Sequence, residues 1–106
     1  MPKFLVHANY TAEGTKGLLK EGGSHRRKVV EELLASLGGK LEAFYFTFGE
    51  GDAVLIIDLP NAEDALTVGF VVRASGMVQS KTTVLIPIEE VDRAVERHVK
   101  YSPPGA

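Results

Sequence analysis

The pattern of apolar and polar positions divides the chain into alternating strands and helices. Runs of β-favouring apolar residues, several with period-two alternation, predict strands at residues 3–10, 41–48, 53–59 and 81–86. The segment 11–23, TAEGTKGLLKEGG, carries four glycines, which favour a broken helix or an irregular turn. The first strand is therefore expected to lead into an irregular connection.

Two longer segments have the periodicity of helices. The first begins at Ser24, a good N-cap, carries apolar residues at helical spacing as far as Leu37 and stops at Gly38. The second begins at Asn61, another N-cap, has acidic residues in its first turn and stops at Gly76. The residues expected to face inward from this second helix are Ala65, Leu66, Gly69, Phe70 and Val72.

The order of these elements, β-α-β-β-α-β, is that of the ferredoxin-like fold in the α+β class. Short right-handed connections place both helices on one face of a four-stranded antiparallel sheet. A length of 106 residues predicts a single domain. We expect its core at about 3–87, followed by an extra C-terminal helix and a tail at 88–106.

The hairpin between the second and third strands determines which side chains share a sheet face. We expect a two-residue turn at Glu50 and Gly51, with Gly51 at positive φ. This turn pairs Phe48 with Ala53 and directs the phenylalanines towards the helices. The other face is also apolar, through Leu5, Tyr45, Val54 and Ile56. Because such a face is not left in water, we expect a homodimer packed sheet on sheet, and possible further assembly.

Composition and charge exclude several partners. Twelve basic and fourteen acidic residues give a formal charge of −2, so no global field attracts nucleic acid or an anionic membrane. No apolar run approaches the roughly 18 residues of a membrane span. The absence of cysteine removes disulfides and thiolate sites and fits a reducing compartment, so a cytoplasmic protein is expected.

Several ordered segments resemble one protein family. The segments TAEGTKGLL, LGGKLEAFYFTFGEGD, VLIIDLP and KTTVL, with the paired Arg26 and Arg27, are similar to the GYD-domain proteins, small bacterial proteins named for a Gly-Tyr-Asp element. The resemblance implies a ferredoxin-like fold of the dimeric α/β-barrel group, in which two sheets face each other. It implies no settled activity. In this chain Gly51 stands where the family has its tyrosine, between Glu50 and Asp52.

Polar side chains on the sheet face away from the helices form a first candidate site. By strand parity they are His7, Asn9, Tyr45, Thr47, Asp58 and one of Thr82 or Thr83. An apolar cavity with a few convergent polar groups is typical of a small-molecule site. His7 could act as a general acid or base with help from Tyr45 or Asp58. Alternatively, His7 and Asn9 satisfy backbone groups and Tyr45 packs in an interface.

A basic run at the start of the first long helix forms a second candidate site. Arg26 and Arg27 lie near a positive helix end, where an anion would be favoured, and Lys16 could join them. The alternative is that acidic residues one turn later pair with this run on a solvated helix surface. Asp52 could serve a cavity or hydrogen-bond the backbone of its own turn, and we favour the turn.

Other chemistries have little support in the sequence. The three histidines have no metal-ligand spacing, no haem-attachment motif or nucleotide loop occurs, and no cofactor is expected. The favoured function is binding of a small organic molecule in a cavity at the sheet face. Two alternatives stay open: a cofactor-independent monooxygenase or isomerase, and a non-catalytic assembly or regulatory module.

Overall fold

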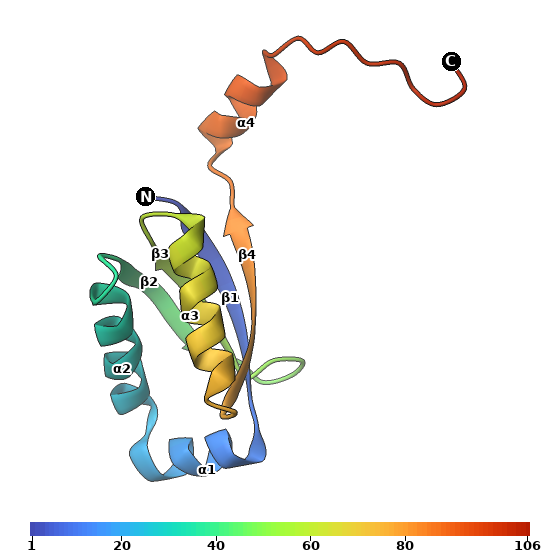
Figure 1. The fold of residues 1–106 in the computed structure, drawn as a ribbon. Helices are drawn as coiled ribbons and strands as arrows, with labels where there is room; N and C mark the ends of the chain where they lie inside the picture. Colours follow the sequence, from blue (N-terminus) through green and yellow to red (C-terminus); the bar gives the residue numbers. More distant parts are fainter.

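A computed structural model describes all residues 1–106 and shows one antiparallel sheet of four strands (Figure 1). The strands are β1 Lys3–Tyr10, β2 Lys40–Phe46, β3 Ala53–Asp58 and β4 Val78–Leu85, and their order across the sheet is β2-β3-β1-β4. The central strands β1 and β3 pair with each other and with the two edge strands. This is the expected ferredoxin-like α+β fold.

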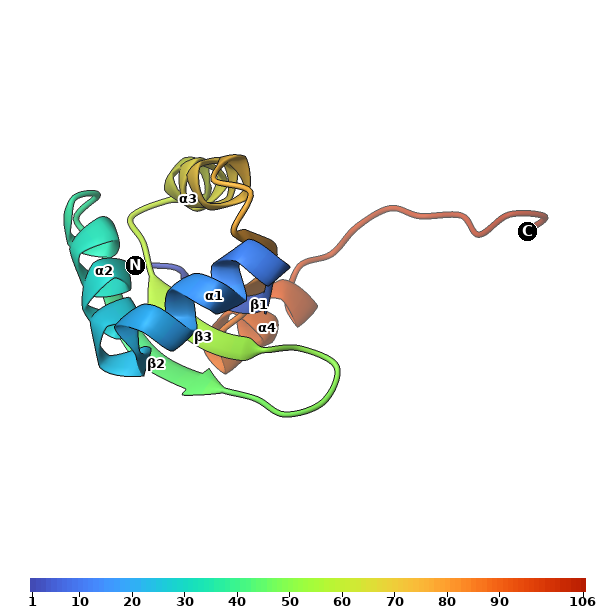
Figure 2. The ribbon, with the colours of Figure 1, turned by 90° about the horizontal axis from the view of Figure 1, so that it is seen from below.

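The helices are α1 Ala12–Glu21, α2 Gly23–Ala35, α3 Ala62–Ala74 and α4 Ile88–Val95. Helices α2 and α3 cover one face of the sheet, and α1 crosses its lower end (Figures 1 and 2). None of the four has the length and apolar character needed to cross a lipid bilayer. Helices α1, α2 and α3 leave the opposite face of the sheet uncovered, and this face is called the open face below.

The glycine-rich segment after β1 is a regular helix, so the predicted irregular connection is wrong. The Thr11 hydroxyl caps α1 by accepting a hydrogen bond from the Gly14 N–H, and donates to the carbonyl of Gly76 at 2.9 Å. Gly14 packs so closely on the Met77 carbonyl that a Cβ there would overlap it. Here glycine permits close packing between distant segments, which propensity alone cannot reveal.

The β2–β3 hairpin also differs from expectation. Phe46 pairs with Ala53, so a six-residue loop, 47–52, replaces the predicted two-residue turn. Gly49, with φ 151°, takes the positive dihedral expected of Gly51. Phe48 points into solvent instead of pairing with Ala53. From Ala43 to Phe46 the register moves by two residues, and since side chains alternate with period two, these residues keep their predicted faces. A bulge between Leu41 and Ala43 then places Leu41 opposite Ile57, on the helix side of the sheet.

The core lies between the sheet and helices α2 and α3. Its buried apolar residues are Phe4, Ala8, Leu34, Ala53, Leu55, Ile57, Leu59 and Ala65. On α3, Ala65 and Gly69 are buried as expected, whereas Leu66 and Phe70 are 58% and 59% exposed, so their predicted inward orientation is wrong. The core is therefore narrow, and small residues form much of its α3 side.

Candidate functional site

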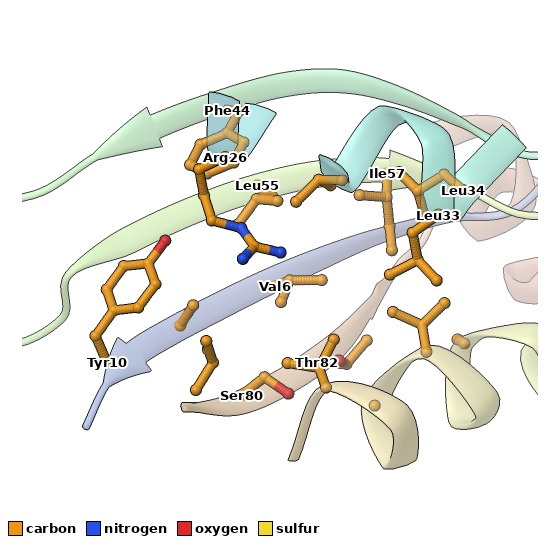
Figure 3. A pocket seen from close by; sticks show the side chains of 17 residues that line it. Val6, Tyr10, Arg26, Leu33, Leu34, Phe44, Leu55, Ile57, Ser80 and Thr82 are labelled. Carbon is orange, nitrogen blue, oxygen red and sulfur yellow. The ribbon is translucent and has the colours of Figure 1, made fainter. Parts of the chain in front are cut away.

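A cavity of about 70 Å³ lies between the sheet and helices α2 and α3 (Figure 3). Of the 17 residues that line it, 13 are hydrophobic, and the polar groups come from Tyr10, Arg26, Ser80 and Thr82. Its walls follow from strand alternation, because every second residue of β1, β3 and β4 points to the helices. The space exists because Ala8, Ala65 and Gly69 are too small to fill it.

Arg26 provides the positive charge of this cavity. It lies in the first turn of α2, half-buried, and its guanidinium group points into the cavity (Figure 3). It takes part in none of the salt bridges of the chain. The predicted N-cap at Ser24 is wrong: α2 begins at Gly23 with Gly22 as its cap, no side chain caps it, and its first turn has no acidic residue. This helix end is thus favourable to an anion.

The neighbours of Arg26 do not form the ion pairs that would explain the basic run as a solvated surface. Only His25 has an acidic partner, Glu21 at 3.6 Å, which lies one turn earlier. Arg27 and Lys28 are exposed and form no salt bridge. The predicted alternative, in which this basic run pairs with acidic residues one turn later in the helix, is therefore not observed.

Tyr10 places a phenol at the same end of the cavity as Arg26 (Figure 3). Its ring stacks on Phe46 with centroids 6.3 Å apart. Burial raises the pKa of the Tyr10 hydroxyl, and the positive charge of Arg26 partly opposes this shift. The phenol is thus a neutral hydrogen-bonding group beside the guanidinium group at neutral pH.

The Asp52 side chain holds the end of β1 in place instead of bonding the backbone of its own turn, so the favoured prediction is wrong. Its carboxylate accepts a hydrogen bond from the Tyr10 N–H at 2.7 Å, and its own N–H donates to the Ala8 carbonyl at 3.0 Å. The loop is closed by Thr47, whose hydroxyl donates to the Gly51 carbonyl at 2.7 Å. Asp52 therefore fixes the backbone that carries Tyr10 and does not line the cavity itself.

Ser80 is a polar group that sequence reasoning missed. Its hydroxyl oxygen is buried, has no hydrogen-bond partner in the chain and faces the cavity (Figure 3). Thr82, two residues further along β4, lines the same space. The only signal in the sequence was the alternation of Val78, Ser80 and Thr82, which gives them one sheet face. A buried hydroxyl without a partner is available to a ligand.

Helix α1 covers the end of the cavity near Arg26. A second hollow of about 220 Å³ lies under α1 and shares Tyr10, Arg26 and Val78 with the cavity. None of the residues of α1 is buried. Lys16, predicted as a possible anion ligand, is on this helix, and its ammonium group pairs with Glu13 at 3.4 Å instead of reaching the cavity.

The open-face residues do not converge within one protomer. His7 lies opposite Val54, and Asp58 opposite Lys3, so His7 and Asp58 are four residues apart along the strands, about 13 Å. The Asp58 carboxylate is instead held by the Lys3 ammonium group at 2.8 Å, which raises the pKa of Lys3 together with Glu42 at 3.1 Å. The expected orientation of His7 by Asp58 is therefore not observed.

The remaining predicted residues lie at the loop end of the open face and near β2. A Cβ at Gly51 would lie 3.8 Å from Asn9 Oδ1 and 3.8 Å from Thr47 Oγ1, so these two polar groups flank that position. Tyr45 is 69% exposed on the open face. Of the predicted site residues, Arg26 and Thr82 line the cavity, which lies on the helix side of the sheet. Thr83, which pairs with Leu5, is the threonine on the open face. No three acidic or histidine side chains gather as a metal site would require.

Comparison with known families matches residues 4–95 to the GYD domain. The chain belongs to the GYD domain family. No curated protein matches this GYD domain protein. A crystal structure of MtbAldR is similar to the GYD chain with a TM-score of 0.55 and 18% identity, over 97% of this chain and 57% of that one. A crystal structure of FFRP-DM1 has a TM-score of 0.49 and 21% identity, over 81% of this chain and 100% of that one.

The first likeness supports the fold and nothing further. The GYD chain spans little more than half the length of the MtbAldR chain. At 18% identity, the shared architecture carries no residue-level role from one protein to the other. The functional argument therefore depends on the groups that line the cavity of this chain.

Proposed function

We propose that this GYD domain protein binds a small carboxylic acid with an apolar body in the cavity between the sheet and helices α2 and α3. The observation that carries the proposal is the guanidinium group of Arg26, which points into a mostly apolar cavity without an acidic partner. A half-buried cation among apolar side chains is costly unless an anion compensates it. A ligand carboxylate would supply that anion.

The other polar groups support the same class of ligand. The Tyr10 hydroxyl lies beside Arg26 and can donate to a carboxylate oxygen. The unpaired Ser80 hydroxyl offers one further hydrogen bond in the cavity. The volume of about 70 Å³ corresponds to several water molecules at about 10–15 Å³ each, which favours a short aliphatic chain or a single ring.

Isothermal titration calorimetry with hexanoate and its neutral analogue hexanamide tests the proposal. We expect hexanoate to bind more tightly and Arg26→Met to weaken it about 10- to 100-fold, because a hydrogen bond to a charged group contributes about 1.5–3 kcal/mol. Arg27→Met is the matched control, since it removes the same charge from an exposed neighbour that does not line the cavity. Equal affinities for both compounds, or equal effects of both variants, would contradict the proposal.

We also infer that two copies pair through the open face. The support is the apolar surface formed there by Leu5, Tyr45, Val54 and Ile56, which alternate with the core residues of the same strands. Tyr45 is 69% exposed and the three aliphatic side chains are half-buried, and a layer of apolar side chains at the surface is typical of an interface. Sedimentation velocity at micromolar concentration measures the association, and a single monomeric species would contradict it.

Catalysis has weaker support than binding. A general acid or base at His7 needs an oriented partner, and Asp58 is engaged by Lys3 at the far end of the strand. In the cavity, the hydroxyls of Tyr10, Ser80 and Thr82 have no adjacent base. These arrangements favour a binding protein over the monooxygenase or isomerase alternative.

A further inference from the structure

Helix α4 presents an apolar stripe that the protomer does not cover. Ile88, Val91 and Val95 recur at helical spacing and are 72%, 45% and 76% exposed. No residue of this helix is buried. An amphipathic helix of eight residues is too short to be stable in water by itself, so its apolar stripe requires a partner surface.

The helix is held away from its own domain. It follows β4 after only two residues, Ile86 and Pro87, and the proline keeps the residue before it extended. As a result α4 continues beyond the end of β4 (Figure 1). The projecting α4 and the extended segment 96–106 together give a radius of gyration of 17.4 Å, against about 13 Å for a compact domain of this length. The stiff connection directs the stripe towards a surface outside the protomer.

The position of α4 indicates where that surface lies. Seen along the strands, α4 projects on the side of the sheet opposite to α2 and α3, which is the side of the open face (Figure 2). A molecule that covers the open face would therefore also meet α4. The open face and the apolar stripe of α4 thus border the same region of solvent.

We infer that the apolar stripe of α4 packs on the open face of a second copy, so that each copy of a dimer contributes a helix to cover the sheet of the other. The inference rests on the proposed pairing through the open face. A two-fold axis makes the exchange reciprocal. In this arrangement a second copy of the chain buries both apolar surfaces, the stripe of α4 and the open face.

Charge supports this occupant over a lipid surface. His7 and Lys81 lie opposite each other on β1 and β4 of the open face and form no salt bridge. Asp92 borders the stripe on α4. The Asp92 carboxylate is attracted to the Lys81 ammonium group, whereas the anionic surface of a membrane repels it.

A pair of triple variants tests the helix separately from the dimer. Ile88→Ser, Val91→Ser and Val95→Ser remove the stripe, while Glu89→Ser, Glu90→Ser and Arg93→Ser change the opposite side of the same helix. We expect the stripe variant to raise the dimer dissociation constant at least about tenfold in sedimentation equilibrium, and the control to leave it nearly unchanged. Equal constants for the wild type and the stripe variant would overturn the role of α4 and leave the dimer standing. A monomeric wild type would overturn both.

Cross-linking locates the contact. The chain has no cysteine, so Val95→Cys can carry a single benzophenone group. When this protein is mixed with an isotopically heavy copy, we expect light-to-heavy cross-links from α4 to peptides of β1 or β4. Cross-links confined to the light chain, or directed to α2 and α3, would overturn the inference. Binding of the full chain to vesicles of anionic phospholipid, lost in the stripe variant, would assign the stripe to a membrane instead.

Discussion

Removal of the Ser80 hydroxyl should stabilise the ligand-free protein. A buried hydroxyl without a partner costs about 1–3 kcal/mol, and Ser80→Ala eliminates that cost. The loss of one oxygen enlarges the cavity by about 10 Å³, and at about 24 cal/mol per Å³ this lowers the gain in stability by a few tenths of a kcal/mol. We therefore expect a net gain of about 1 kcal/mol in the free energy of unfolding, together with weaker binding of ligands that use this hydroxyl.

Urea and thermal unfolding at one fixed protein concentration measure the gain. An increase of about 1 kcal/mol corresponds to a rise in midpoint temperature of about 4–8 °C for a domain near this size. Ser75→Ala is the control, because the Ser75 hydroxyl donates to the Val72 carbonyl at 2.6 Å and accepts from the Met77 N–H at 3.1 Å. Its loss should destabilise by about 1 kcal/mol. If both variants lose the same stability, the hydroxyl of Ser80 is not unpaired and the reasoning fails.

Two further predictions concern the phenol in the cavity and the loop after β2. The pKa of Tyr10 is raised in the folded state, so the stability that the neutral phenol contributes is fully present below about pH 10 and is lost as the pH rises through the pKa of the folded state. Tyr10→Phe should therefore reduce the loss of stability at alkaline pH, as measured by urea titrations. An unchanged pH profile of stability would contradict this prediction. Gly51 has no positive φ, and a Cβ there would make only ordinary van der Waals contacts, so Gly51→Tyr should change stability by less than about 0.5 kcal/mol. At Gly39 a Cβ would overlap the Asp58 carbonyl, so Gly39→Ala should cost more than about 2 kcal/mol. Similar unfolding midpoints for these two glycine variants would refute the conclusion that position 39 excludes a Cβ and position 51 accepts one.

The sheet and its two faces could be predicted from the sequence because the relevant signal is local and periodic. The alternation in 43–46 and 53–58 survived an error in the loop, since a two-residue change in register leaves Phe44 and Phe46 on the helix side. The cap at Asn61 was also predictable, because its side chain bonds the N–H of Asp64, three residues later. Local rules were sufficient wherever the partners are close in the chain.

The cavity could not be predicted in the same way. Its wall includes Ala8 of β1 and Ala65 and Gly69 of α3, and a volume left between small residues far apart in the chain has no local signature. The basic run led to Arg26, but the sequence could not show that this side chain turns inward while Arg27 remains exposed. The continuity of α1 was missed for a similar reason, since Thr11 anchors it to Met77, which lies 66 residues later in the chain.

The alternation of β1 and β3 has a consequence for the kinds of sequence change this domain tolerates. Val6 and Leu55 line the cavity, while their immediate neighbours Leu5 and Val54 lie on the open face. A substitution at one of these positions alters one side of the sheet and leaves the other intact. Deletion or insertion of a single residue exchanges the two sides over the rest of the strand and damages both at once. Variation in these strands should therefore proceed by replacement, and changes in length should be confined to loops such as 47–52.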